Sequence, residues 1–210
     1  DSNRVASMTD PEENVTRYEY DGNGSLIYVL DPNGGETRTQ YDRRNLPIQI
    51  ADAEGSVTQY SYDAAGRMTQ VIDSLDHASV YTFDALGRLI SERDALGQVT
   101  SYTYDSTGNL IRKTAPNSAE WNLEYDARGL LVKVIDPLGS ISAMTRDGLG
   151  RVVESTDEAG KKTFYTYDPL SRVTRMIDPL GRATEVNYNA HGLLTRLTDA
   201  NDQTTSYGYD

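Results

Sequence analysis

The chain contains no cysteine, which excludes disulfide bonds and thiolate chemistry. Histidine is nearly as scarce. His77 and His191 are the two present, each flanks a turn, and neither has a second histidine at a spacing suited to a metal. Without such groups, and with no Ser-His-Asp ordering that stands out, nucleophilic catalysis has no basis in the sequence. We expect no catalytic residue, no cofactor and no metal site.

Long hydrophobic runs are also missing. No apolar segment approaches the roughly 20 residues that a membrane-spanning helix needs, and the first residues do not resemble a signal peptide. Basic residues are outnumbered, with 20 Lys and Arg against 32 Asp and Glu and a net charge of −12. No basic stripe could neutralise phosphates, so we expect neither nucleic-acid binding nor insertion into a membrane.

What the chain does have is a repeat of 21 residues. An aromatic residue followed by Asp marks each period: Tyr20-Asp21, Tyr41-Asp42, Tyr62-Asp63, Phe83-Asp84, Tyr104-Asp105, Tyr125-Asp126, Tyr167-Asp168 and Tyr209-Asp210, with Arg146-Asp147 and Tyr188-Asn189 as the departures. Self-similarity at a fixed period is typical of arrays whose units pack on their neighbours. We expect one array over residues 1–210, about ten repeats long, that forms part of a larger chain.

Each period carries two turn signals of the form Asp-x-x-Gly. One row includes Asp21 to Gly24, Asp63 to Gly66, Asp105 to Gly108 and Asp126 to Gly129; the other includes Asp31 to Gly34, Asp136 to Gly139 and Asp178 to Gly181. Asp can accept a backbone hydrogen bond from two residues further on, and Gly readily adopts the left-handed conformation that ends such a loop. The pattern predicts hairpin loops built on a type I turn with a glycine bulge.

Segments of six or seven residues separate the turns, which is a common strand length. Consecutive hairpins join antiparallel neighbours, so the sequence predicts an all-β fold, a long antiparallel meander with two strands per repeat. An open twisted sheet rarely exceeds ~10 strands without curling or closing. We therefore expect a curled or spiralling strip that forms part of a hollow shell.

The strand before the first turn reads Thr-x-Tyr-x-Tyr, as in Thr16-Tyr18-Tyr20. A spacing of two places these side chains on one face, where they can stack as an aromatic ladder. The strand after the turn has apolar residues at adjacent positions, such as Leu26 and Ile27. Strict alternation would direct them to opposite faces, so we expect apolar side chains on both sides of the strip.

The motif Asp84-Ala85-Leu86-Gly87-Arg88-Leu89, together with Asp178-Pro179-Leu180-Gly181-Arg182, resembles the YD repeat of bacterial Rhs (rearrangement hotspot) proteins. The resemblance covers essentially the whole chain. It assigns a structural role to the repeat residues Tyr20, Asp21, Gly24, Tyr62, Asp63, Gly66, Tyr104, Asp105, Gly108, Tyr125, Asp126, Gly129, Tyr167 and Asp168. It carries no catalytic residue onto this sequence.

The resemblance implies a non-enzymatic wall segment of a β-shell that encloses the C-terminal toxin domain of the same parent chain. It further implies a secreted or delivered effector of a bacterium, of the Gram-negative type, that is cytoplasmic before export and has secretion-apparatus components such as the type VI machinery as partners. A surface adhesion or recognition module that binds carbohydrate or protein, as in wall-associated or teneurin-like relatives, is the alternative. An enzyme ranks third.

Two further interpretations stay open at this point. The recurring carboxylates could form acid pairs or a calcium array, although their confinement to turns favours a capping role. The stretch 115–147 departs most from the repeat, with Trp121 in the Thr position and Arg146 in the aromatic position. These departures suggest either neutral drift or a local bend or cargo contact.

Overall fold

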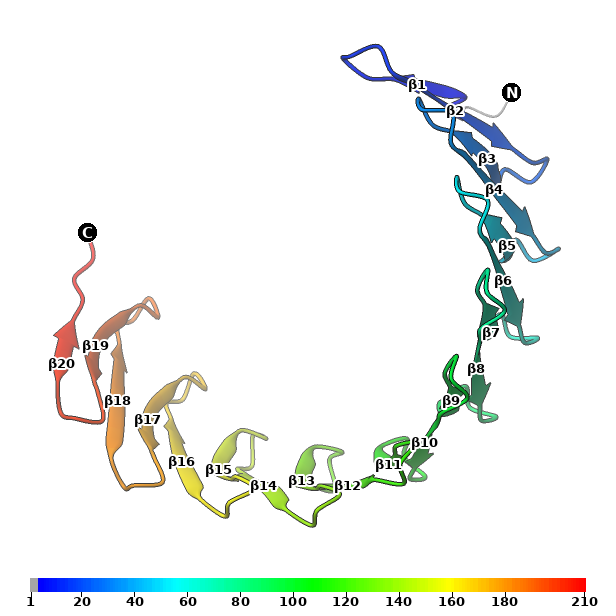
Figure 1. Cartoon of the computed structure of the whole chain (residues 1–210). Coiled ribbons are helices and arrows are strands. Elements are labelled where there is room, and N and C mark those ends of the chain that lie inside the picture. The colour runs from blue at the N-terminus through cyan, green and yellow to red at the C-terminus, as the bar shows by residue number, and fades with distance from the viewer. Residues whose placement is uncertain (1–3) are drawn as a thin grey trace. The chain divides into compact units, whose positions relative to one another are not determined.

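A computed structural model describes residues 4–210 of the chain (Figure 1). Its contacts divide the chain into two units, Asp1–Ser101 and Tyr102–Asp210, and the boundary falls within strand β10. Each unit is described by itself.

Strands alone make up the regular structure of the first unit. They are β1 (Ser7–Thr9), β2 (Val15–Tyr20), β3 (Leu26–Leu30), β4 (Glu36–Tyr41), β5 (Pro47–Ala51), β6 (Val57–Tyr62), β7 (Met68–Ile72), β8 (Ala78–Phe83), β9 (Leu89–Arg93) and the first part of β10 (Val99–Tyr104).

The second unit continues the same pattern. Its strands after β10 are β11 (Leu110–Thr114), β12 (Glu120–Tyr125), β13 (Leu131–Ile135), β14 (Ile141–Arg146), β15 (Val152–Thr156), β16 (Lys162–Tyr167), β17 (Val173–Ile177), β18 (Ala183–Tyr188), β19 (Leu194–Thr198) and β20 (Thr204–Ser206). Residues 4–210 contain no helix, and hence none long and apolar enough to cross a membrane.

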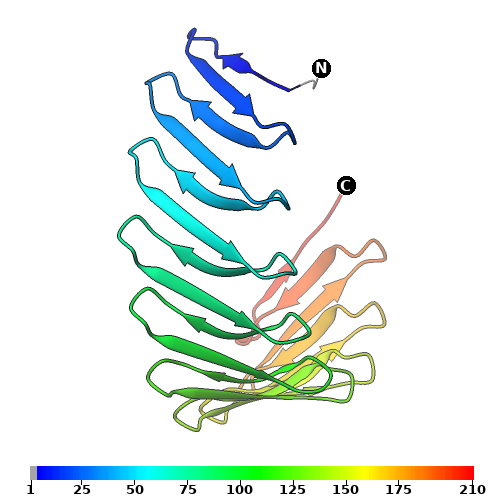
Figure 2. The ribbon, with the colours of Figure 1, turned by 90° about the vertical axis from the view of Figure 1, so that its right-hand side faces the viewer.

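Within each unit the chain is an antiparallel meander, as predicted. In the first unit β2 pairs with β3 and β3 with β4; in the second, β12 pairs with β13 and β13 with β14. The described strands contact their immediate neighbours in sequence and no others. Figure 2 shows the hairpins of the first unit, coloured blue to green, side by side in a single layer.

The turns have the predicted geometry. In the first of them Gly24 N–H donates to the Asp21 carbonyl at 3.1 Å, Asp21 N–H donates to the Ser25 carbonyl at 2.9 Å, and Gly24 has a φ of 95°. Six of the described turns place a residue other than Gly at this left-handed position, with φ values from 60° to 67°: Glu13, Asn45, Asp76, Ser118, Ser171 and Asp202. Asn and Asp tolerate this conformation, whereas Glu13, Ser118 and Ser171 are strained in it.

A β-bulge follows the first turn in hairpins of both units, such as β2–β3 and β12–β13, and overturns one expectation. Leu26 lies opposite Tyr20 and Val29 opposite Tyr18, while Ile27 has no partner between them. The extra residue interrupts strict alternation. Leu26 therefore shares the face of the tyrosines, and so does Ile27, which lies two positions before Val29. The prediction that these two apolar positions serve opposite faces was wrong.

The two faces of the strip differ in burial. In β2 the residues Thr16, Tyr18 and Tyr20 are half-buried, whereas Val15, Arg17 and Glu19 are exposed. No hydrophobic side chain among residues 4–210 is fully buried. A single layer cannot enclose a core, so its stability must come from backbone pairing and from contacts between side chains of adjacent strands.

Candidate functional site: the links between repeats

The tyrosine at the end of each aromatic strand joins its repeat to the preceding one. Its hydroxyl donates to the carbonyl of the residue 15 positions earlier, at 2.7 to 3.2 Å: Tyr20 to Val5, Tyr41 to Leu26, Tyr62 to Pro47, Tyr125 to Leu110, Tyr167 to Val152, Tyr188 to Val173 and Tyr209 to Leu194. From Leu26 onward the accepting residue begins the strand that carries the bulge. Because the bulge disrupts the ladder there, the hydroxyl supplies a donor where backbone pairing is irregular.

An arginine directly after the turn glycine joins its repeat to the following one. Arg67 Nε donates to Asp63 Oδ2 at 2.6 Å, within its own turn. Its guanidinium carbon lies 4.9 Å from the centre of the Phe83 ring, and Nη1 donates to the Asp84 carbonyl at 3.4 Å. One side chain thus contacts a carboxylate of its own turn and both the ring and the carbonyl of the next turn.

The same arrangement recurs in the second unit. Arg151 Nε lies 2.7 Å from Asp147 Oδ2, its guanidinium 4.7 Å from the Tyr167 ring centre, and Nη1 3.1 Å from the Asp168 carbonyl. Arg172 lies 4.4 Å from the Tyr188 ring centre. Each cation–π contact contributes about 0.5–1 kcal/mol at such sites, and a part-exposed ion pair about as much or less. The links are individually weak and act by repetition.

Two turns provide the linking arginine from a different position. Arg44 and Arg128 occupy the third residue of their turns, where the fifth residue is leucine. Arg128 Nη2 lies 3.0 Å from Asp126 Oδ2 and 3.3 Å from the Asp147 carbonyl of the next repeat. Arg44 likewise contacts Asp42 and the Asp63 carbonyl. The link therefore requires a guanidinium that reaches the next turn, and not one fixed sequence position.

Arg146, which stands in the aromatic position, keeps the backward link of the tyrosines. Its Nη2 donates to the Leu131 carbonyl at 3.2 Å, 15 residues earlier, and Nη1 donates to the Gly150 carbonyl at 2.9 Å. The guanidinium replaces the tyrosine hydroxyl as donor to the same backbone group. This departure is accounted for inside the array. A bend or cargo contact at residues 115–147 stays a prediction.

The turn aspartates are held by dense hydrogen bonding. Asp105 Oδ1 accepts from Thr107 Oγ1 at 2.8 Å and from the backbone N–H groups of Thr107 and Asn109, both at 2.9 Å; Oδ2 accepts from Asn109 Nδ2 at 2.9 Å. The side-chain bonds from Thr107 and then Asn109 lower the pKa of Asp105 to about 2. Backbone donors likewise lower the pKa of Asp21, Asp42, Asp126 and Asp168.

The structure distributes the predicted repeat residues along one edge of each unit rather than gathering them into one site. The predicted tyrosines are the last residues of β2, β6, β10, β12 and β16: Tyr20, Tyr62, Tyr104, Tyr125 and Tyr167. The turns that follow begin with the predicted aspartates Asp21, Asp63, Asp105, Asp126 and Asp168. The left-handed position of four of these turns is held by the predicted glycines Gly24, Gly66, Gly108 and Gly129, with φ values of 95°, 82°, 99° and 75°. The described residues include no group of three or more metal-ligating side chains. His77 Nδ1 lies 3.0 Å from Asp73 Oδ2.

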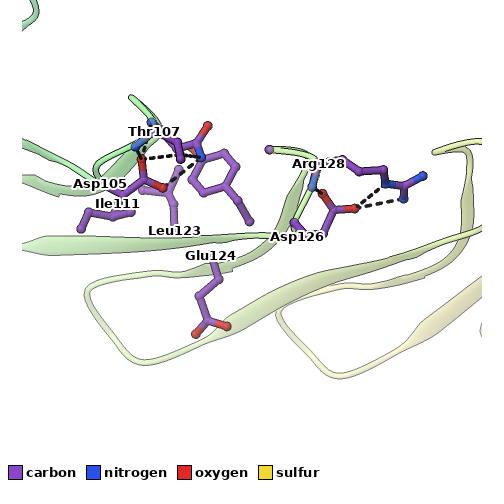
Figure 3. A pocket seen from close by; sticks show the side chains of 11 residues that line it. Asp105, Thr107, Ile111, Leu123, Glu124, Asp126 and Arg128 are labelled. Carbon is purple, nitrogen blue, oxygen red and sulfur yellow. Dashed lines mark hydrogen bonds and ion pairs between the residues drawn. The ribbon is translucent and has the colours of Figure 1, made fainter.

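A groove of about 850 Å³ separates two successive turns of the second unit, residues 105–109 and 126–129. Figure 3 shows the Asp105 and Thr107 side chains on one turn and Asp126 and Arg128 on the next, with Ile111 and Leu123 on the same side of the ribbon and Glu124 on the other side. The groove floor combines a ring, Tyr125, with aliphatic side chains, and its walls are polar.

Sequence reasoning overlooked the linking arginines. Their signal is visible in Gly66-Arg67 and Gly150-Arg151, where an arginine directly follows the turn glycine. The spacing to the next aromatic residue could have suggested a contact between repeats. Only the three-dimensional stacking of successive turns shows that the side chain reaches it.

Six segments of the chain match the RHS repeat family: residues 1–36, 41–77, 83–119, 104–141, 146–183 and 188–210. The chain belongs to the RHS repeat family. The tyrosine and arginine links are thus features of an RHS repeat array. A search of curated proteins found no match.

Solved structures with the same architecture include TcdB2-TccC3 without its hypervariable C-terminal region. That crystal structure is 16% identical in sequence, with a TM-score of 0.66 over 97% of this chain and 14% of the other. The pore of the Photorhabdus luminescens Tc holotoxin is 15% identical, with a TM-score of 0.47 over 93% of this chain and 14% of the other. At 16% identity, the similarity to TcdB2-TccC3 shows a shared fold and nothing more. This RHS array spans about one seventh of the TcdB2-TccC3 chain.

Proposed function

We propose that this chain is a non-enzymatic wall segment of an RHS-type β-shell that encloses the C-terminal toxic domain of the same parent chain. The observation that carries the proposal is the fold likeness to TcdB2-TccC3 over 97% of this chain. That structure is of TcdB2-TccC3 without a hypervariable C-terminal region, so the full relative carries such a region. By analogy, the repeat strip would be the constant part that surrounds a variable cargo.

Two features of the strip support a wall. The sheet is one layer thick and has no fully buried hydrophobic residue among those described, so its half-buried tyrosine face is free to contact something else. Continuous backbone pairing with short turns also gives a protease few extended segments to cleave. The wall would act by exclusion, keeping the cargo from proteases and from its targets until delivery as a secreted effector.

Limited proteolysis of the full-length parent protein tests the proposal. After digestion and gel filtration under native conditions, mass spectrometry identifies every fragment that co-elutes with the repeat region. We expect an intact C-terminal fragment that stays associated with a resistant array. A matched sample unfolded in urea before digestion is the control, and there the C-terminal fragment should be degraded.

Rapid loss of every segment outside the repeats in the native sample would contradict enclosure. The adhesion or recognition module would then be the better explanation of the array.

A further inference from the structure

The hairpin of β11 and β12 departs from the repeat at two positions that face each other. Lys113 of β11 stands where other repeats have an apolar side chain, such as Val29 and Val134. Trp121 of β12, the single tryptophan of the chain, stands where most repeats have threonine, and the register pairs it directly with Lys113. Because Val29 lies opposite Tyr18 in the first unit, the equivalent Lys113 belongs to the tyrosine face.

Two aromatic rings from neighbouring strands flank the Lys113 side chain. Its Nζ lies 5.9 Å from the centre of the Trp121 ring and 6.0 Å from the centre of the Tyr102 ring of β10. Both aromatic residues are half-buried, whereas Lys113 is exposed. The ammonium group is therefore held above the rings of the tyrosine face, where a partner from outside the array can reach it.

The Lys113 ammonium lacks a carboxylate partner within the array. Lys133 pairs with Glu124 at 2.9 Å and Lys162 pairs with Glu154 at 2.6 Å, whereas Lys113 forms no ion pair in the part of the chain that the structure describes. The contacts with the two rings bring no counter-charge, because an aromatic ring is neutral. The positive charge of Lys113 is therefore available to an anionic group.

The turn that follows Lys113 has also lost the acid that its row of turns usually carries. It begins with Ala115, and residues 115–119 contain no Asp or Glu. The four later turns of this row begin with Asp136, Asp157, Asp178 and Asp199. Glu120 lies on the opposite face of the hairpin, 3.9 Å from Arg112 Nη1. The hairpin thus supplies no acid of its own to Lys113 on the tyrosine face.

We propose that Lys113, held between Tyr102 and Trp121, binds a carboxylate side chain of an acidic polypeptide segment outside the array. An exposed ammonium donates charge-assisted hydrogen bonds to a carboxylate, and the rings beside it can contact the aliphatic part of the same residue. Leu123 and Val134 are paired with each other further along this face and are half-buried. An apolar residue next to the acid in the partner segment would fit against them.

The surroundings of Lys113 favour a polypeptide over a free anion. An isolated anion would gain the contact with the ammonium alone, and such a contact contributes little at an exposed site. A segment that also covers Trp121 and its apolar neighbours would gain from the burial of their surface. The site lies in one hairpin of the second unit and does not depend on the proposed enclosure of a toxin.

The fluorescence of Trp121 tests the proposal, because no other tryptophan contributes to the emission of the 210-residue chain. The chain is titrated with the peptide acetyl-Glu-Leu-Glu-Leu-amide. We expect a saturable change in emission that is half complete at about millimolar peptide, since an exposed ion pair contributes little binding energy. The matched peptide acetyl-Gln-Leu-Gln-Leu-amide and inorganic phosphate should each change the emission several-fold less at equal concentration.

Two variants make the result specific to Lys113. Met176 occupies the equivalent position of another repeat, so Lys113→Met should fold, and its response to the acidic peptide should fall to that of the neutral peptide. Lys133→Met is the control, because Lys133 lies on the opposite face and pairs with Glu124, and it should leave the titration unchanged. Circular dichroism checks that both variants are folded. The proposal is overturned if the acidic peptide acts no more strongly than the neutral peptide or phosphate, or if Lys113→Met titrates like the original chain.

Discussion

At the scale of single residues, the array is held by side chains that reach beyond their own repeat. The tyrosine hydroxyl reaches backward to a carbonyl beside a bulge, and the arginine reaches forward to a ring and a turn. The tyrosine and the arginine are both part of the repeat motif, but their contacts with neighbouring repeats depend on how the turns stack in three dimensions. The same backward contact made by Arg146 indicates that the carbonyl needs a donor, whichever side chain provides it.

Removing one hydroxyl should therefore weaken the array measurably. We expect Tyr167→Phe to destabilise the chain by about 1 kcal/mol, because the Val152 carbonyl loses a donor at 2.7 Å in a part-buried place. Urea unfolding followed by circular dichroism measures the change. Phe83→Tyr is the reciprocal variant and should stabilise by a similar amount. Equal midpoints for both variants and the original chain would show that the hydroxyl contributes nothing.

At the scale of the element, the hairpin and the glycine bulge of its turn were predictable, but the strand bulge at Ile27 was not. Asp-x-x-Gly at a fixed interval specifies turn, strand length and antiparallel pairing, because each of these depends on local backbone preferences. The register shift after Tyr20 depends on how Ile27 is accommodated between two strands. Alternation alone therefore assigned Leu26 and Ile27 to opposite faces, although the pairing puts both on the tyrosine face.

The cost of backbone strain can be tested at turn positions in the left-handed conformation. Ser118 has a φ of 63°, and we expect Ser118→Gly to stabilise the chain by about 0.5–1 kcal/mol because the backbone strain of an L residue is relieved. Gly181→Ala should destabilise the chain by about 1 kcal/mol, because alanine is strained at the positive φ of this position. A steric clash would not contribute, since a Cβ at Gly181 would have no atom within 4 Å. Thermal unfolding of both variants measures the effects. A loss of stability in Ser118→Gly would contradict the strain argument.

At the scale of the whole molecule, the repeated aspartates make stability depend on acid. A carboxyl whose pKa is lowered on folding stabilises the fold above its unfolded pKa, and this contribution is lost as the pH falls toward the folded value. For Asp105 this stabilisation is lost as the pH falls from its ordinary pKa of 3.8 to its folded-state pKa of about 2. The lowered pKa values of Asp21, Asp42, Asp126 and Asp168 make stability depend on pH in the same direction.

We expect the melting temperature to be nearly constant from pH 7 to about 5 and to fall steeply below about pH 4. Asp105→Asn is the matched variant, because Asn189 holds the equivalent turn with 3.0 and 2.9 Å bonds from the backbone of His191 and Leu193. It should lose less stability between pH 5 and pH 3 than the original chain. A melting temperature that does not change between pH 5 and pH 2 would contradict the acid dependence.

Within each unit, each described strand touches the strands directly before and after it in sequence, and this has a mechanical consequence. Tension applied to one end of a unit would load only the terminal repeat, because no distant segment crosses over to share the force. Each repeat of 21 residues that detaches would release roughly 70 Å of extended chain at about 3.3–3.6 Å per residue. The strip would therefore unfold one repeat at a time from the loaded end, while the remaining repeats stay folded.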